Sequence, residues 1–400
     1  MFLEIILALI VGIAIGTITG LIPGIHINLV SAIVVSSLAV LFLYFSPISI
    51  AVFIVSLSIT HTFIDFIPSI FLGAPDESAL SVLPGHKLLL EGKGYEAVIY
   101  TITGCLISIP LLIILAPIFM LMLPKLFFYL KFVMFLILIS VSVYMISNNK
   151  NKFQALIIFL LSGFLGISTL FFQNSQPLLP LLSGLFGASS LISSIRKKEK
   201  LKEQKITKVK IKFSEIKQTF LTSLIASPLC SFLPALGSSQ AAIIGANLQS
   251  QDKENSNSFL MLLGSVNFLV MALSFITLYS ISKSRTGAAV AIQEILKDFN
   301  FPNLLVIILA VIISSLIAFL ISIFLARIFS RSIAKINYTK LSISIIVFLS
   351  IVILIFSKFP GLLLYLVSTI VGLFCIESGA RRTNLMGCLM LPSILLYLPI

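Results

Sequence analysis

Charged side chains are scarce in this sequence. Only 10% of its 400 residues are Asp, Glu, Lys or Arg, whereas 58% are hydrophobic. Soluble globular proteins carry about 25% charged residues, so this chain has too few polar groups to cover its own surface. The composition therefore excludes an ordinary soluble domain and indicates that lipid surrounds most of the chain.

Cysteine, histidine and catalytic motifs are also sparse. The four cysteines form no C-x-x-C pair, and the three histidines form no H-E-x-x-H motif, so we expect no disulfide framework and no zinc site. Walker A, G-x-S-x-G and dinucleotide-binding glycine motifs are absent from the sequence as well. We therefore expect no cofactor, no metal and no enzymatic activity on this chain.

Long apolar runs are what the sequence has in abundance. A helix needs about 20 apolar residues to cross a bilayer core, and candidate segments lie at 2–20, 102–123, 132–146, 304–325 and 341–356. These runs do not alternate as barrel strands would. The first has no basic n-region and no cleavage motif, so we interpret it as a retained helix. We predict an all-α, multi-pass protein of the cytoplasmic membrane with about 10–14 membrane segments.

One basic run divides the chain. Residues 196–212 hold nine of the 27 Lys and Arg residues and only two acids. A short basic loop of this kind lies in the cytoplasm by the positive-inside rule, and we expect topology signalling rather than nucleic-acid binding. Counting helices outward then places 86–96, 148–152, 327–340 and 377–382 inside, and 124–131, 173–176 and 357–360 outside.

The two halves of the chain resemble each other. Segments 131–147, 153–171 and 177–195 match 340–357, 359–376 and 382–398, and equivalent loops fall on opposite sides of the membrane. This pattern is typical of inverted-topology repeats. We predict a first membrane repeat at 1–195, a cytoplasmic linker at 196–212 and a second membrane repeat at 213–400, each repeat with Pro/Gly-broken or re-entrant helices.

Proline-containing breaks occur at matching places in the two halves. Proline interrupts a helix, and in a membrane the freed backbone groups must face protein or a water-filled cavity. Broken helices at corresponding positions predict a transporter binding site, and their helix N-termini suit an anion. A simple proline kink and small-residue helix packing are the alternatives. The predicted substrate-binding residues are Pro23, Gly24, His26, Asn28, Pro234, Gly237, Ser238, Ser239 and Gln240.

Ionisable residues within apolar sequence are the other candidates. His61 and Asp65 are spaced i, i+4 and therefore share a helix face, where they form either a structural pair or a proton relay. Asp76 and Glu77 follow Pro75 and either favour a helix start or couple transport to an ion. Arg285 suits a carboxylate, although an interfacial topology charge is the alternative.

Three blocks of the sequence resemble a known family. GLIPGIHINLVSA at 20–32, FLGAPDESALSVLPGHKLLLEGKGYEAV at 71–98 and GARRTNLMGCLMLPSILL at 379–396 are similar to the large permease, TctA, of the tripartite tricarboxylate transporters, most of all its shorter archaeal-type branch. Pro23, Gly24, Pro75, Gly85 and Pro234 match family positions. His26 stands where the family has a second glycine, and Ala235 stands where glycine is common.

The resemblance implies a cation-coupled carboxylate permease. Its expected partners are a small-molecule organic anion, coupling H⁺ or Na⁺, the lipid bilayer, a small membrane subunit and an external substrate-binding protein. A flippase for a phosphorylated polyprenyl lipid is an alternative, because paired P-G breaks occur there too. A membrane-embedded enzyme is a further alternative, with acids such as Asp76, Glu77, Glu91 and Glu96 on one rim.

Overall fold

In the computed structural model, the regular elements of the described part of the chain are all helices. It describes residues 2–22, 27–71, 82–147, 149–171, 178–196, 202–232, 242, 245, 256–284, 286–333 and 338–398. Within these ranges, seven helical segments are long and apolar enough to cross a membrane. The predicted multi-pass, all-α membrane fold is therefore confirmed.

The described helices divide between the two halves of the chain. The first half contains α1 (Phe2–Leu21), α2 (Ile27–Ser36), α3 (Leu38–Leu41), α4 (Pro47–Ile64), α5 (Phe66–Phe71), α6 (Val82–Leu90), α7 (Gly94–Ser147), α8 (Lys152–Thr169), α9 (Leu178–Leu182), the π-helix η2 (Ser183–Ala188) and α10 (Ser189–Arg196). The second half contains α11 (Phe213–Phe232), α13 (Ser256–Ile281), α14 (Gly287–Ile295), α15 (Phe301–Ile333), α16 (Tyr338–Glu377), the 3₁₀ helix η3 (Arg382–Met386) and α17 (Gly387–Tyr397).

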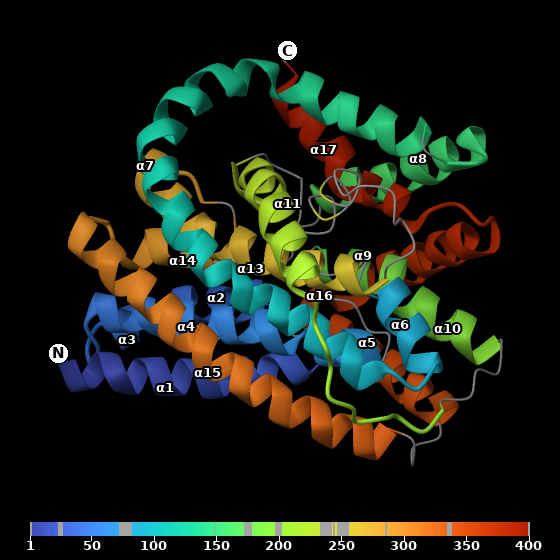
Figure 1. The fold of residues 1–400 in the computed structure, drawn as a ribbon. Helices are drawn as coiled ribbons and strands as arrows, with labels where there is room; N and C mark the ends of the chain where they lie inside the picture. Colours follow the sequence, from blue (N-terminus) through green and yellow to red (C-terminus); the bar gives the residue numbers. More distant parts are fainter. Residues whose placement is uncertain are drawn as a thin grey trace.

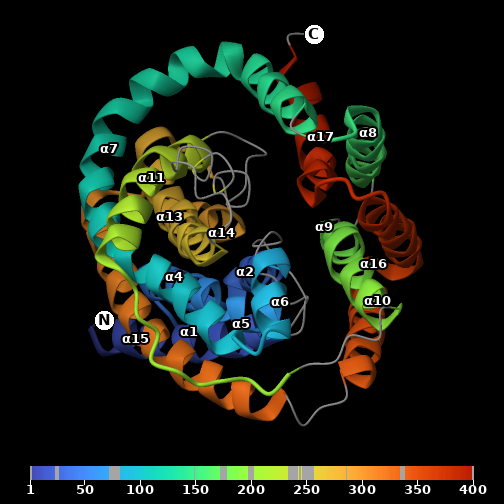
Figure 2. The same cartoon turned by 45° about the vertical axis from the view of Figure 1, so that its right-hand side comes forward.

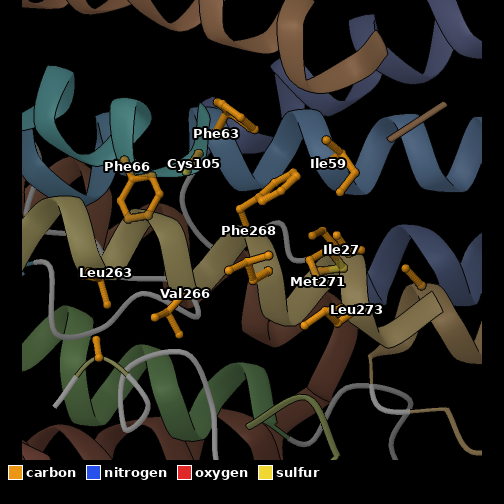
Figure 3. Close-up of a cluster of buried hydrophobic side chains, with 14 of the residues drawn as sticks. Ile27, Ile59, Phe63, Phe66, Cys105, Leu263, Val266, Phe268, Met271 and Leu273 are labelled. Atoms are coloured by element: carbon orange, nitrogen blue, oxygen red, sulfur yellow. The ribbon is translucent and has the colours of Figure 1, made fainter. Parts of the chain in front are cut away.

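Two spans form the centre of the molecule. In the α4–α5 segment 94% of the apolar window is buried, and in α13 the figure is 89%, against at most 44% for the other five. Helices α1, α13, α14 and α15 pack around α4, while α7 and α11 pack around α13. The rings of Phe63 and Phe268 join the two central helices edge to face, 5.9 Å apart, and Figure 3 shows both within the apolar core.

Helices α1 and α4 run side by side in the same direction. Glu4 accepts a 2.6 Å hydrogen bond from the Ser46 backbone N–H, and further along, Gly12 lies against Phe53 and Gly20 against Ile64. Such glycines let two helices approach closely. Because both helices start at one end, the chain between them must return to it. We call the described part of residues 2–46 the hairpin, and its first helix, α1, is one of the seven that are long enough to cross a membrane.

The two ends of the bundle can be identified from contacts. At the end that we call the N-terminal end, Phe42 and Pro47 line a cavity with Leu296 and Asn303. At the end that we call the linker end, the Gly94 N–H donates to Gln204 Oε1 at 2.9 Å, and Arg327 Nε lies 3.4 Å from the Tyr95 hydroxyl.

The central spans cross the bundle in opposite directions. Helix α4 begins at Pro47 at the N-terminal end, and α5 finishes with Phe71, whose ring is 6.1 Å from that of Phe329 towards the linker end. Helix α13 ends at the N-terminal end, where Tyr279 contacts Phe299 with the ring centroids 5.8 Å apart. An inverted repeat requires such opposite directions, and the repeat itself stays a prediction.

Helix α7 differs from the expectation. A loop was predicted at 124–131, but the helix continues from Gly94 to Ser147 through Pro110, Pro117 and Pro124. Figure 1 shows α7 as an arch that crosses the molecule and turns back over its top. Each proline removes one backbone donor and bends the helix, so the chain reverses its direction without leaving helical geometry. The break predicted at 357–360 is a kink at Lys358, with φ 55° and ψ −165°.

The later helices form a second packing unit. Helices α9, η2 and α10 pack along α16, and α8 packs against α17. Figure 2 shows these helices on the opposite side of the molecule from α1, α4 and α13, with α7 reaching from one group to the other. The glycines permit very close approach here too, since a Cβ on Gly166 would lie 1.8 Å from the Cys388 carbonyl oxygen.

Candidate functional site

The α4–α5 span carries several buried polar side chains. Three of its hydroxyl groups bond to the preceding helical turn: Ser56 to Val52 O at 2.7 Å, Ser58 to Ile54 O at 2.6 Å and Thr62 to Ser58 O at 2.8 Å. Such bonds satisfy the hydroxyl locally and require no ligand. The ionisable residues of the span, His61 and Asp65, cost more to bury than a hydroxyl and need another explanation.

His61 is held by the first helix of the hairpin. Its side chain is 2% exposed, and Nδ1 lies 3.1 Å from the Thr19 hydroxyl oxygen. Thr19 Oγ1 is also 3.2 Å from the Gly16 carbonyl oxygen. When the hydroxyl donates to that carbonyl, its oxygen is free to accept a hydrogen bond from the imidazole N–H. The contact therefore accommodates either tautomer of His61.

Asp65 lies one turn beyond His61, where the helix is interrupted. Its side chain is 4% exposed, and its backbone N–H donates to the His61 carbonyl oxygen at 2.9 Å. Helix α4 ends here and α5 begins at Phe66. Pro68 lacks the N–H that would bond to the Ile64 carbonyl, which accounts for the interruption. His61 and Asp65 therefore lie one helical turn apart, with Asp65 at the C-cap of α4.

Asp65 also lies near the crossing of α7 and α13. The Asp65 carboxylate is close enough to act electrostatically on the thiol of Cys105, and that thiol donates to the Gly264 carbonyl oxygen at 3.2 Å. Figure 3 shows Cys105 together with Phe63, Phe66 and Phe268. A carboxyl group buried to this extent is costly to ionise. It can function by taking up a proton or a metal cation.

The pair lies beside the end of α1. The helix ends at Leu21, one residue beyond Gly20, where a Cβ would lie 3.2 Å from the His61 carbonyl oxygen. The chain resumes as α2 at Ile27, which is 2% exposed. The predicted binding residues Pro23, Gly24 and His26 lie outside the described residues. Asn28 belongs to α2, but its side chain is not among those described.

The other predicted site residues cannot be placed beside this pair. They fall outside the part of the chain that the structure describes: Asp76, Glu77, Pro234, Gly237, Ser238, Ser239, Gln240 and Arg285. Thr286, which follows Arg285 in the sequence, caps α14 by accepting the Ala289 N–H at 3.2 Å. The roles of these residues stay predictions.

Arg382 is an ionisable residue that sequence reasoning missed. It is 6% exposed, its Nη2 donates to the Phe186 carbonyl oxygen at 2.7 Å, and its guanidinium lies 5.6 Å from the centre of the Phe186 ring. Burial lowers the pKa of Arg382 to about 10, so it is charged at neutral pH. The sequence placed it in a basic loop, and nothing in the spacing distinguishes it from its exposed neighbour Arg381.

Serine hydroxyls also link three helices. Ser265 of α13 donates to Ser223 of α11 at 2.6 Å, and it bonds to Ser108 of α7 as well. Serines at such positions look like ordinary small residues in the sequence. Within the part of the chain that the structure describes, His, Cys, Asp and Glu form no group of three that could hold a metal ion.

Comparisons with known proteins identify the family of the chain. The family model described as the tripartite tricarboxylate transporter TctA family matches residues 6–387. A protein of Methanocaldococcus jannaschii, described as uncharacterized protein MJ1079, is 34% identical over 405 residues, which cover 98% of this chain and 99% of that protein. No solved structure matches. The chain therefore belongs to the TctA family, the large membrane component of the tripartite tricarboxylate transporters.

Proposed function

We propose that the chain is a secondary transporter that moves an organic anion, a di- or tricarboxylate, across the cytoplasmic membrane with H⁺ or Na⁺ coupling. The observation that carries this proposal is the burial of both His61 and Asp65 in one span, with His61 bonded to Thr19 beside the end of α1. An ionisable group inside a membrane span costs about 2.5–3.5 kcal/mol. A function that uses its charge change accounts for keeping two of them there.

Asp65 and His61 have different roles in this proposal. Asp65 binds the coupling proton or sodium ion, because a buried carboxylate is costly to ionise and gains most from a cation. His61 relays a proton or fixes the end of α1 through Thr19. The substrate carboxylates would bind at the broken elements around Pro23 and Pro234, where helix N-termini favour anions. Asp76, Glu77 and Arg285 are further candidates on the same grounds.

The arrangement of the halves supports alternating access. We propose that residues 1–195 and 213–400 are inverted repeats joined by the linker 196–212. The opposite directions of α4 and α13, together with the matching order of α1 with α11 and α6 with α14, favour this division. We place the linker end in the cytoplasm, because the basic linker and Arg327 gather there. A small membrane subunit and an external substrate-binding protein are the proposed partners.

The lipid-flippase alternative gains no support from the apolar groove between α1, α2 and α4. The groove has a volume of about 420 Å³ and is lined by Leu7, Val11, Ile33 and Phe53 among others, with Glu4 as its charged residue. A carboxylate repels a phosphate headgroup. We therefore keep the carboxylate transporter as the conclusion.

The proposal is tested with the purified full chain in liposomes. Uptake of labelled citrate and succinate is measured with an inward Na⁺ gradient, an inward H⁺ gradient or neither, and glucose serves as the neutral control. A thermal-shift series with the same compounds detects binding without partner subunits. We expect a carboxylate-specific shift and gradient-dependent uptake. Carboxylate shifts no larger than those with glucose, together with uptake that ignores both gradients, would overturn the proposal.

A further inference from the structure

The linker between the two halves is bound to the bundle. Gln204 is 7% exposed; its Oε1 accepts the Gly94 N–H at 2.9 Å, and its Nε2 donates to the Leu89 carbonyl oxygen at 3.0 Å. The Lys205 N–H donates to the Gly92 carbonyl oxygen at 2.9 Å. A buried amide with both ends bonded fixes its backbone firmly. Residues 202–212 therefore form a docked segment, which we call the strap.

Side chains alternate along the second half of the strap. Val209 and Ile211 are half-buried and pack against the core, whereas Lys208, Lys210 and Lys212 are exposed. This period of two is that of an extended chain, and Figure 2 shows the strap without helical turns, beside the later part of α15. Three lysines consequently point outward in a row, fixed in position by the two apolar side chains between them.

The helix that follows shows where this row lies relative to lipid. The residues at i, i+4, i+8 and i+12 of α11 share one outward face: Phe213 is 78% exposed, Lys217 is exposed, and Leu221 and Ile225 are 50% and 54% exposed. An exposed apolar face on a membrane helix contacts acyl chains, and aromatic and lysine side chains mark its polar boundary. The strap lysines stand at that boundary.

Helix α15 reaches the same boundary. Its exposed side changes from Leu320 and Phe324, 65% and 63% exposed, to the exposed Arg327 and Arg331. In Figures 1 and 2 the strap runs alongside this part of α15. Among the acids on these segments, Glu215 accepts the Lys212 backbone N–H at 3.0 Å, and Glu203 is exposed at the start of the strap. The surface is strongly positive overall.

We propose that this surface, formed by Lys208, Lys210, Lys212, Lys217, Arg327 and Arg331, binds the phosphate groups of anionic phospholipids in the leaflet at the linker end. Each basic residue near an anionic leaflet contributes about 1 kcal/mol of attraction. Because the strap is docked, its lysines do not lose the entropy of ordering a free loop when they bind. The surface leads directly into α11, so bound lipid would stabilise the start of the second half. The inference requires only that the chain is embedded in a membrane.

The absence of tryptophan provides a direct test. The chain has no Trp, so a Phe213→Trp variant of the full chain carries a single fluorescent reporter at the strap. A Phe153→Trp variant is the matched control, because Phe153 is 71% exposed at the start of α8. Both are reconstituted in phosphatidylcholine vesicles that contain about 10% brominated phosphatidylglycerol or the same fraction of brominated phosphatidylcholine, whose headgroup is zwitterionic.

The comparison of the two quenchers decides the outcome. We expect brominated phosphatidylglycerol to quench the Phe213→Trp reporter at least about twofold more strongly than brominated phosphatidylcholine does. This preference should decrease at high salt. Adding Lys208→Ser, Lys210→Ser and Lys212→Ser should abolish this preference and leave the Phe153→Trp reporter unchanged. Equal quenching by the two lipids at the strap, or a preference that survives loss of the three lysines, would overturn the proposal.

Discussion

The Thr19 hydroxyl oxygen of α1 lies 3.1 Å from Nδ1 of His61 in α4. This contact joins the entering helix of the hairpin to an ionisable residue of the most buried span. Both side chains are buried, so water cannot replace either partner. The contact therefore fixes the end of α1 against α4.

Replacing Thr19 with valine should weaken transport. Valine keeps the shape of threonine but removes the hydroxyl, and a buried imidazole that loses a partner costs about 1–3 kcal/mol. If the same energy is lost from the transport cycle, initial uptake rates in proteoliposomes should fall roughly fivefold to 100-fold. Thr17→Val is the control, since the Thr17 hydroxyl bonds only to its own helix, at the Ile13 carbonyl oxygen. Equal losses in the two variants would contradict a special role for the contact.

Asp65→Asn should separate stability from coupling. The amide has nearly the shape of the carboxyl group but no charge, and burying a charge costs about 2.5–3.5 kcal/mol on insertion scales. We therefore expect the Tm of the variant to equal or exceed that of the wild type, while uptake no longer responds to Na⁺ or H⁺ gradients. The matched control is Asp298→Asn at an exposed position. If uptake by the variant still responds to the ion gradients, Asp65 is not part of the coupling site.

The sequence predicted some of these features because the bilayer imposes simple rules. Apolar length gave the spans, and the i, i+4 rule placed His61 and Asp65 on one helix. The arch of α7 was missed because Pro124 predicts a break, whereas in the structure the helix bends and continues through Pro124 to Ser147. The burial of Arg382 was missed because the sequence does not distinguish it from its neighbour Arg381. Arg381 is exposed and Arg382 is buried, and only tertiary packing makes that difference.

The sequence did not predict the crossing of α7 and α13 for a related reason. Glycine in a membrane helix has several uses, and a single Gly104 does not indicate its partner. In the structure a Cβ on Gly104 would lie 1.9 Å from the Met261 carbonyl oxygen, and one on Gly264 would lie 1.9 Å from that of Thr101. The crossing thus depends on two glycines that lie far apart in the sequence.

Adding a methyl group at either glycine should force these helices apart. We expect Gly104→Ala and Gly264→Ala each to lower the free energy of unfolding by about 1–3 kcal/mol, measured as a fall in Tm in detergent. Leu121→Phe is the control, because Leu121 of α7 is 75% exposed and has room for a larger ring. Unchanged Tm values for both alanine variants would show that the helices are not packed as closely as described.

Arg382→Met should leave stability unchanged or raise it. Burial lowers the pKa of Arg382 from 12.5 to about 10. The buried charge therefore lowers the free energy of unfolding at every pH below 10. This energetic penalty decreases as the pH rises through 10, because the folded state then loses the proton. An apolar side chain of similar length removes that penalty. We expect the Tm advantage of the variant to shrink above about pH 10. The exposed Arg381→Met should show neither effect, and a large fall in Tm for Arg382→Met would contradict the assignment.

Gln204→Ala should release the strap. The variant deprives the Gly94 N–H and the Leu89 carbonyl oxygen of their partner, which costs about 1–3 kcal/mol of local stability. Trypsin cleaves an opened segment in proportion to its open population, so cleavage at the strap lysines should rise roughly fivefold to 100-fold. Gln218→Ala on the half-buried side of α11 is the control. Because the linker end is placed in the cytoplasm, cleavage should occur in inside-out vesicles and not in right-side-out ones. Equal cleavage of wild type and Gln204→Ala would show that the amide does not hold the strap.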